Sequence, residues 1–328
     1  MSTRRSNSGC LTCIDLSRSD DSMREVVVAS GKGGTGKTSL VGSLARLAAP
    51  AVVVDCDVDA ANLHLIVEHE VLETHDFSTS RRASIDPAQC SACGLCRELC
   101  RFGAVTARTD DPGGIPVYAV EPFSCEGCGL CSRLCPDKAI AFEPVISGQW
   151  FRSRSTGGPF LHARLGVAES NSGRLVSVLR EQARAEAEAD GCEFVLIDGS
   201  PGVGCPVIAS ITNAAYLLIV TEPSLSALHD MRRLVRLAEQ FRVPTGICIN
   251  KFDLNGGLTM HIEQYAREHE LPVHGRIPFD PTFVQAQREG RVYLDLAAPE
   301  RVAEIERIWA GVREAVTAVG SGVGQFRV

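Results

Sequence analysis

Short apolar runs alternate with stretches of helical periodicity along most of the chain. Valine-rich runs of this kind are typical of strands in a parallel sheet that is covered on both faces. The runs that predict buried strands are Met23–Ser30, Ala51–Asp55, Phe194–Asp198, Tyr216–Thr221 and Gly246–Asn250, and Gly275–Pro278 ends a further one.

Helical periodicity fills the intervals between these runs. Within Ser39–Ala49, Leu40, Leu44 and Leu47 recur on one helical face. Further helices are predicted over Ser226–Phe241, Thr259–His269 and Pro299–Val319. Strands that alternate with helices indicate βαβ units, so the chain is predicted to be a doubly wound α/β protein with a mostly parallel sheet.

The alternation breaks between residues 77 and 146, where cysteine, glycine and proline dominate. A repeat with a period of 35 residues lies inside this segment: Cys90, Cys93, Gly94, Leu95, Cys96 and Cys100 recur as Cys125, Cys128, Gly129, Leu130, Cys131 and Cys135. A turn signal over Asp110–Gly114 separates the two copies. We therefore expect a small α+β insert, residues 77–146, inside a discontinuous domain formed by residues 23–76 and 147–320, with a disordered extension (1–22) and a tail (321–328).

Composition and charge narrow the function classes. The 328 residues carry a formal charge of −7, and such an acidic balance lacks the basic footprint of a nucleic-acid binder. No apolar run approaches the roughly 20 residues of a spanning helix, and the polar residues 1–22 contain no apolar core of a secretion signal. We expect a cytoplasmic protein. In that compartment the 14 cysteines are better interpreted as metal ligands or redox groups than as disulfides.

A phosphate-binding motif follows the first strand. Gly31–Thr38 matches G-x-x-x-x-G-K-[ST] between a predicted strand and a predicted helix. Glycines let backbone N–H groups surround phosphates, Lys37 would neutralise them, and Thr38 would bind Mg²⁺. The predicted cofactor-binding residues here are Gly31, Gly33, Gly34, Thr35, Gly36, Lys37, Thr38 and Ser39.

Acidic and amide side chains lie at the carboxyl ends of several predicted strands. Open α/β sheets bind ligands at these ends. Asp198 is placed to hold the Mg²⁺ ion. Of the three acids that follow the second strand, one could hold Mg²⁺ and another could orient the attacking water, and Asp57 is the best candidate for such a role, ahead of Asp55 and Asp59. Asn250–Asp253 reads N-K-x-D, which resembles the base-reading loop of GTPases and leaves GTP open beside ATP.

Two C-x₂-C-x₂-C-x₃-C runs, the second followed by Pro136, predict two [4Fe–4S] clusters. In two-cluster ferredoxins the fourth cysteine of each run binds the other cluster. Zinc is the alternative, although zinc sites usually pair two C-x₂-C knuckles. The predicted ligands are Cys90, Cys93, Cys96 and Cys135 for one cluster, and Cys125, Cys128, Cys131 and Cys100 for the other. We assign no metal role to Cys10, Cys13 or Cys248.

These motifs resemble the deviant Walker A ATPases, the group of MinD, Mrp and the nitrogenase iron protein, and more narrowly the MinD-like ATPases with an inserted ferredoxin domain. The two lysines of Gly31–Thr38 carry the resemblance, with Asp57 at switch I and Asp198–Gly202 at switch II. It implies that Lys32 reaches the nucleotide of a partner in an ATP-bound homodimer, and that the loop containing Pro278 and Asp280 lies beside adenine.

Two features depart from the relatives. The last ten residues contain a single basic side chain, so we expect no stable membrane anchoring of the kind that MinD has. Cys205 lies seven residues after Asp198, the offset at which the nitrogenase iron protein has a cluster ligand, but no second ligand accompanies it, and an idle thiol is the simpler interpretation.

Three functions remain open. The first is an ATP-gated electron carrier that delivers electrons to a redox partner. The second is an assembly factor that carries iron–sulfur or metal-cluster cargo to an apo-protein acceptor. The third is a regulatory ATPase whose clusters sense redox state.

Overall fold

The computed structural model describes residues 23–109, 114–166 and 171–321. Its largest element is a nine-stranded sheet. In spatial order the first seven strands are parallel to one another, and each of the last two pairs with the strand before it in antiparallel orientation. That order is β13 (Val273–Ile277), β12 (Thr245–Asn250), β11 (Tyr216–Thr221), β1 (Arg24–Ala29), β10 (Phe194–Asp198), β2 (Ala51–Asp55), β9 (Gly158–Leu165), β8 (Gly148–Ser155) and β3 (His69–Phe77).

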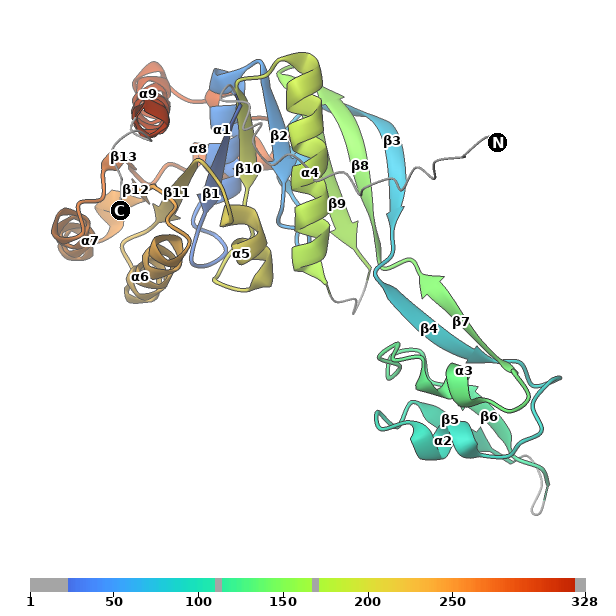
Figure 1. Cartoon of the computed structure of the whole chain (residues 1–328). Coiled ribbons are helices and arrows are strands. Elements are labelled where there is room, and N and C mark those ends of the chain that lie inside the picture. The colour runs from blue at the N-terminus through green and yellow to red at the C-terminus, as the bar shows by residue number, and fades with distance from the viewer. Residues whose placement is uncertain (1–22, 110–113, 167–170, 322–328) are drawn as a thin grey trace, which may run out of the picture.

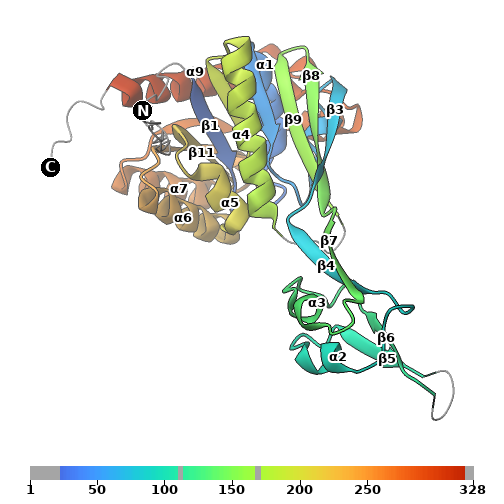
Figure 2. The same ribbon diagram turned by 45° about the vertical axis from the view of Figure 1, so that its right-hand side comes forward.

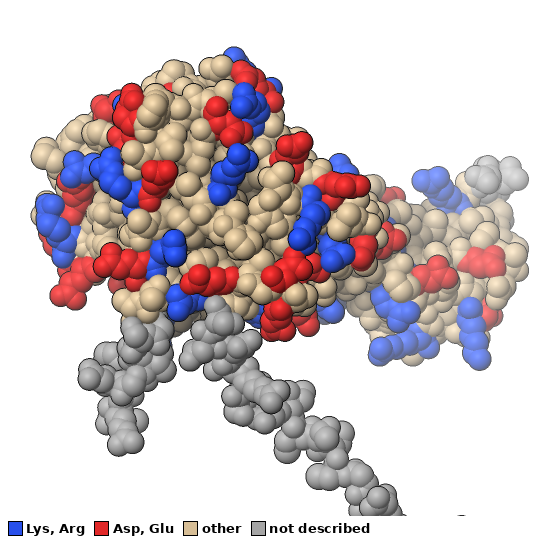
Figure 3. Space-filling model, turned by 90° about the horizontal axis from the view of Figure 1, so that it is seen from above, with Lys and Arg blue, Asp and Glu red and all other residues tan. Residues whose placement is uncertain are grey.

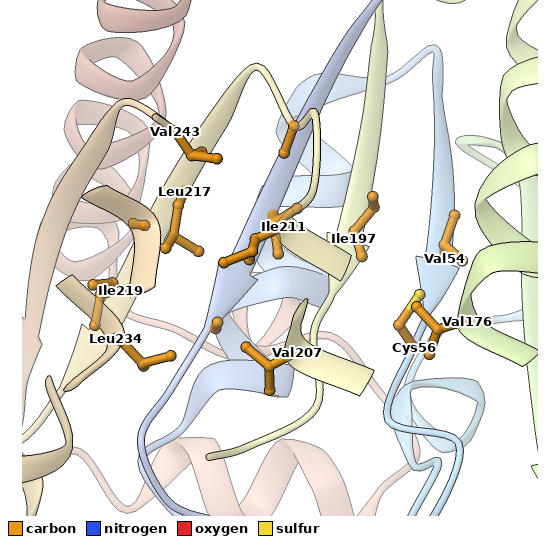
Figure 4. Close-up of a cluster of buried hydrophobic side chains, with 14 of the residues drawn as sticks. Val54, Cys56, Val176, Ile197, Val207, Ile211, Leu217, Ile219, Leu234 and Val243 are labelled. Carbon is orange, nitrogen blue, oxygen red and sulfur yellow. The ribbon is translucent and has the colours of Figure 1, made fainter. Parts of the chain in front are cut away.

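Helices cover both faces of this sheet (Figure 1). One face packs on α4 (Ser172–Asp190), α5 (Cys205–Ile211), α6 (Leu225–Gln240) and α7 (Gly256–Glu268). The other packs on α1 (Lys37–Ala48), α8 (Thr282–Arg288), α9 (Pro299–Ser321) and the short 3₁₀ segments η1 (Leu63–Leu65) and η3 (Tyr293–Asp295); a third, η2 (Phe252–Leu254), follows β12. Figure 4 shows strand and helix side chains of the first face meeting in one apolar layer.

The predicted α/β class with a mostly parallel sheet is confirmed, and each predicted strand and helix corresponds to an element of the structure. The valine-rich strands are buried along their whole length because helices lie on both sides of them. The structure adds β3, β8, β9, α4, α5 and α8, which the sequence analysis did not name. The predicted extension over 1–22 and most of the turn at 110–114 and of the tail lie outside the described residues.

Between β3 and β8 the chain leaves the main sheet and forms the insert, residues 80–145 (Figure 2). It contains two separate antiparallel ribbons and two short helices. These are β4 (Ser80–Ile85) paired with β7 (Ile140–Val145), β5 (Val105–Arg108) paired with β6 (Val117–Val120), and the helices α2 (Leu95–Leu99) and α3 (Leu130–Leu134). The two helices follow Gly94 and Gly129 at equivalent places of the repeat, both with positive φ (80° and 71°).

The insert leaves the sheet at the same edge as the phosphate loop. β9 runs parallel to β2, β8 runs antiparallel to β9, and β3 runs antiparallel to β8. The last residue of β3, Phe77, therefore pairs with the first residue of β8, Gly148, at the carboxyl edge of the parallel strands. Figures 1 and 2 both show the insert extending beyond this edge.

The surface of the α/β domain mixes both signs of charge. On the face shown in Figure 3, Lys and Arg side chains alternate with Asp and Glu side chains. Of the helices that the structure describes, none combines the length and apolar character needed to cross a bilayer.

Candidate functional site

The phosphate loop connects the carboxyl end of β1 to the first turn of α1, as the motif predicted. Gly36 precedes the helix with a φ of 85°, in the left-handed region that glycine adopts at little cost. A Cβ atom at Gly36 would also lie 2.3 Å from Nδ2 of Asn250. The loop is therefore built around a glycine that no other residue can replace without displacing Asn250.

Lys37 and Asp198 form a buried ion pair at the centre of this edge. Lys37 Nζ also lies 3.4 Å from Thr38 Oγ1. The second carboxylate oxygen of Asp198 and the hydroxyl of Thr35 are buried without a hydrogen-bond partner among the described residues. Because buried polar groups are normally satisfied, these atoms indicate that a polar ligand completes the site. Mg²⁺ with a phosphate chain fits this donor set, since Thr38 and Asp198 supply oxygens and Lys37 supplies a cation.

Asp55 shapes the loop that carries Asp57. Its Oδ1 accepts a hydrogen bond from the Asp57 amide at 3.0 Å, and its Oδ2 accepts one from the Leu63 amide at 3.0 Å. Burial, reinforced by the charge of Asp198, raises the pKa of Asp55 to about 7. Burial also raises the pKa of Asp57, while the Lys37 ammonium partly offsets that rise. Asp57 thus lies within electrostatic reach of Lys37, whereas Asp59 is exposed.

Lys32 is held by its own chain. Its Nζ lies 2.7 Å from Glu222 Oε1 and donates to Ser224 Oγ at 3.1 Å. The same Glu222 accepts from Lys251 Nζ at 2.9 Å, and Lys251 also donates to the Gly34 carbonyl at 2.8 Å. Burial alone would raise the pKa of Glu222, but hydrogen bonds from both lysines outweigh it and lower that pKa. Sequence reasoning missed Glu222, although its place directly after β11 was an available signal.

The N-K-x-D segment braces the phosphate loop. Asn250 Nδ2 donates to the Thr35 carbonyl at 2.7 Å, beside the contact of Lys251 with Gly34. Asp253 Oδ1 accepts from the Phe279 amide at 2.7 Å. The segment therefore ties the loop after β13 to the phosphate loop, and its Asp is engaged inside the chain.

The remaining predicted nucleotide contacts are placed on the same side. Asp280 accepts from the Thr282 amide at 2.8 Å and from the Tyr293 hydroxyl at 2.7 Å, so it begins α8 and is turned inward. Ser39 accepts from Gln287 Nε2 at 2.9 Å, which joins α1 to α8. Pro278 directly follows β13, the strand next to the one that ends in Asn250.

In the insert, the cysteines form two groups. One cavity is lined by the four thiols predicted for the first cluster, Cys90, Cys93, Cys96 and Cys135, and also by Cys131. Burial raises the pKa of Cys96, and the neighbouring Cys90, Cys131 and Cys93 raise it further. The structure therefore brings the first three thiols of one run together with the fourth thiol of the other.

The second group has the same composition by symmetry. Burial raises the pKa of Cys131, and its neighbours Cys125, Cys128 and Cys100 raise it further. Cys100 thus lies near Cys131 of the second run. Within the described residues, no three His, Cys, Asp or Glu side chains converge on a point as a single metal ion requires.

The other described thiols are separate from these groups. Cys56, Cys192 and Cys248 are buried in the α/β domain, and burial raises the pKa of each. Cys205 is exposed at the first position of α5. Cys10 and Cys13 lie outside the described residues.

The comparison with family models decides the identity of the nucleotide site. The model described as the CobQ/CobB/MinD/ParA nucleotide binding domain matches residues 26–293. The chain belongs to this family. As a member of the MinD/ParA family it is a P-loop ATPase, and the phosphate loop with Lys37, Thr38 and Asp198 lies within the matched region.

The chain is also similar to three individual proteins. Protein MJ0578 of Methanocaldococcus jannaschii is 32% identical over 245 residues, covering 70% of this chain and 79% of that protein. A cytosolic Fe–S cluster assembly factor NUBP2 homolog of Nematostella vectensis is 26% identical over 132 residues, covering 34% of this chain and 47% of that protein. The septum site-determining protein MinD of Pyrococcus horikoshii, complexed with Mg-ADP, shares the fold, with a TM-score of 0.52 at 15% identity over 90% of this chain and 98% of that chain.

Proposed function

We propose that this ATPase is a nucleotide-gated electron carrier. The observation that carries the proposal is an insert, attached at the nucleotide edge of the sheet, in which thiols of the two cysteine runs lie together: Cys135 lines one cavity with Cys90, Cys93 and Cys96, and Cys100 neighbours Cys131. An exchange of fourth ligands between two runs is the pattern of two-cluster ferredoxins. A switch that responds to nucleotide and a site that fits an electron relay are therefore built into one chain.

The ligand sets follow from the grouping. Cys90, Cys93, Cys96 and Cys135 would hold one [4Fe–4S] cluster, and Cys125, Cys128, Cys131 and Cys100 the other. When bound, each cluster would accept and release one electron at a potential set by hydrogen bonding and solvent exposure. The chain supplies part of that environment, since the Ala104 amide donates to Cys100 Sγ at 3.3 Å and apolar side chains such as Ile85 and Ile140 line the first cavity.

On the nucleotide side, each role follows from position. Lys37 would move its ammonium from Asp198 to the phosphates, which would free both Asp198 oxygens for the shell of Mg²⁺. Asp57 would orient the attacking water. Lys32 would leave Glu222 and reach the nucleotide of a second copy, so that ATP closes a homodimer. Asp253 Oδ1 is already bonded to the Phe279 amide, so the carboxylate is partly committed within the chain, which favours ATP over guanine recognition.

The test uses one anaerobic preparation of the full chain, assayed for iron, sulfide, ATPase activity and cluster potential with and without Mg-ATP. We expect about eight irons per chain and a potential that shifts when Mg-ATP binds. Lys37→Ala should weaken nucleotide binding at least tenfold and abolish the shift while iron content stays unchanged. Arg46→Ala, an exposed cation on the same helix, is the matched control. Zinc in place of iron, or a potential and a partner-reduction rate that ignore nucleotide, would refute the proposal.

A second function, delivery of iron–sulfur cargo to an apo-protein, is favoured by the partial similarity to the NUBP2 homolog and by the exposed Cys205. In this case a labile cluster would bridge two chains through Cys205. Cluster transfer to an apo-ferredoxin should then require Cys205 and ATP. Undiminished transfer by Cys205→Ser would leave the electron carrier as the better description.

A further inference from the structure

The insert joins the α/β domain through a neck, which we define as the two chain segments Phe77–Ser80 and Val145–Gly148. Ser147 lies at its centre and is fully buried. Its amide donates to the Phe77 carbonyl at 2.8 Å, and its hydroxyl lies 3.2 Å from the hydroxyl of Ser80. Ser147 therefore ties the outgoing segment of the neck to the incoming one by both backbone and side chain.

The neck is also bonded to the end of β9. The Gly166 amide donates to the Ser147 carbonyl at 2.8 Å. One residue earlier, the Leu165 amide donates to the carbonyl of Val58 at 3.3 Å, and Val58 directly follows Asp57. Two consecutive amides at the end of β9 thus hold the neck on one side and the Asp57 loop on the other.

Side-chain packing reinforces this connection. Val58 and Phe77 are both buried in the cluster on the α4 face of the sheet. At Gly148 an added Cβ atom would lie 2.7 Å from the Arg164 carbonyl oxygen and 3.2 Å from Leu165 Cα. Because interiors at this density transmit displacement rather than absorb it, a shift of the Asp57 loop must move the neck or break these contacts.

We propose that the neck is a coupling element and that Ser147 and Gly148 are positioning residues for ATP hydrolysis. Through Leu165 and Gly166 they hold the backbone of the loop that carries Asp57, and through Phe77 and Ser80 they hold the base of the insert. A nucleotide that moves Asp57 therefore reorients the insert and changes its affinity for a bound partner. Because coupling between binding sites is reciprocal, the partner changes nucleotide affinity by the same factor. The inference deepens the proposed gating and rests on it for its use in electron transfer.

The first measurement is hydrogen exchange of the full chain, prepared anaerobically, with and without Mg²⁺ and a non-hydrolysable ATP analogue. The analogue should change exchange of peptides covering residues 145–150 and 158–166 by about fivefold or more, the lower end of usual coupling between sites. Gly148→Ala should reduce kcat for ATP with little change in KM, because Lys37, Thr38 and Asp198 are untouched. Ser147→Ala, which removes the hydroxyl contacts with Ser80 and with the Val145 carbonyl but keeps the backbone bonds, should do the same more weakly. Ser84→Ala, on the exposed side of β4, is the matched control and should change neither readout.

The outcomes separate this inference from the proposed function. If Mg-ATP shifts the cluster potential in the wild type and in Gly148→Ala alike, gating stands and the neck does not carry it. If exchange at residues 145–150 ignores the analogue although nucleotide binds, the coupling is refuted whatever the potential does. Coupling seen by exchange without any shift of potential would support the neck and overturn the gating.

Discussion

The α/β domain and the insert are held together in different ways. In the α/β domain, strands buried on both sides separate two large apolar clusters, and each helix layer contributes fully buried side chains, such as Leu44 from one layer and Leu179 from the other. Among the described residues of the insert, the buried cluster consists of Ala83, Cys96, Val105 and Ile140. Half of the partly buried residues packed against it are cysteines, namely Cys100, Cys125, Cys131 and Cys135.

This contrast separates two sources of stability. Burial of apolar area is sufficient to stabilise a domain as large as the α/β domain. Segments of a few dozen residues usually need a disulfide or a metal centre as well. In the insert, the thiols occupy the positions that apolar side chains would fill. The cavity lined by Cys90, Cys93, Cys96 and Cys135 lies where a core would be. The insert should therefore fold with its clusters, and the α/β domain without them.

Cluster loss is the largest effect we expect. Cys96→Ser removes a buried thiol of the proposed first cluster, and because each run would supply a ligand to the other cluster, iron should fall by more than half. Metal-binding free energy is folding free energy in such sites, so amide protection of residues 80–145 should drop at least tenfold while the α/β domain keeps its own. Hydrogen exchange with iron analysis measures both quantities.

Cys205→Ser is the control for that experiment, since it removes an exposed thiol outside the insert. An insert that kept its protection without iron would show that the small apolar cluster suffices, and the contrast between the two regions would be lost.

A substitution in the core of the α/β domain should have the opposite effect: it should destabilise that domain and leave the insert intact. Leu44→Ala in α1 removes a fully buried side chain and should lower the free energy of unfolding of the α/β domain by about 2–5 kcal/mol. Iron content of the native protein should be unchanged. Urea unfolding followed by far-UV circular dichroism gives the first value. Loss of iron at concentrations where the α/β domain is still folded would show that the two regions are not independent.

The sequence predicted the centre of each region better than the boundary between them. Gly31–Thr38 and the two cysteine runs carry strict spacing, so local chemistry alone located them. The edge strand β3 was missed because it is largely exposed and rich in polar and charged residues, as in His69–Phe77, and so lacks the apolar run of a central strand. Contacts such as Lys32 with Glu222 join residues 190 positions apart and follow from the folded sheet rather than from any motif.

Acid should weaken the α/β domain through His162. This ring stacks with Phe151, Phe160 and His64, and burial, helped by His69 and His64, lowers its pKa to about 3. The unfolded chain binds this proton near pH 6.5, so the stabilisation is complete above that pH and declines as pH falls toward 3. Between pH 6.5 and 5 the decline amounts to about 2 kcal/mol.

The variant His162→Phe should flatten that part of the stability profile, measured by urea unfolding at several pH values. An unchanged slope would assign the acid sensitivity to other groups, such as the neighbouring His64, whose pKa burial also lowers.

The smallest effect concerns Lys32. Glu222→Gln removes the ion pair at 2.7 Å that holds Lys32 on its own chain, and a partly exposed pair of this kind contributes about 1 kcal/mol at most. ATP-dependent dimerisation should therefore tighten about fivefold, which sedimentation velocity can measure. Glu239→Gln, an exposed acid on α6, is the control. Weaker dimerisation of the Glu222 variant would mean that Glu222 supports the closed state instead.

The pairing of Phe77 with Gly148 also has a consequence for how such a chain can arise. The two ends of the insert are side by side at the tip of a hairpin, so a cluster-binding segment can be added or exchanged there without cutting a central strand. A plain turn between these residues would close the same sheet. The fold thus has an insertion point beside its nucleotide-binding edge. Related chains can carry a different insert at this point while the sheet stays unchanged.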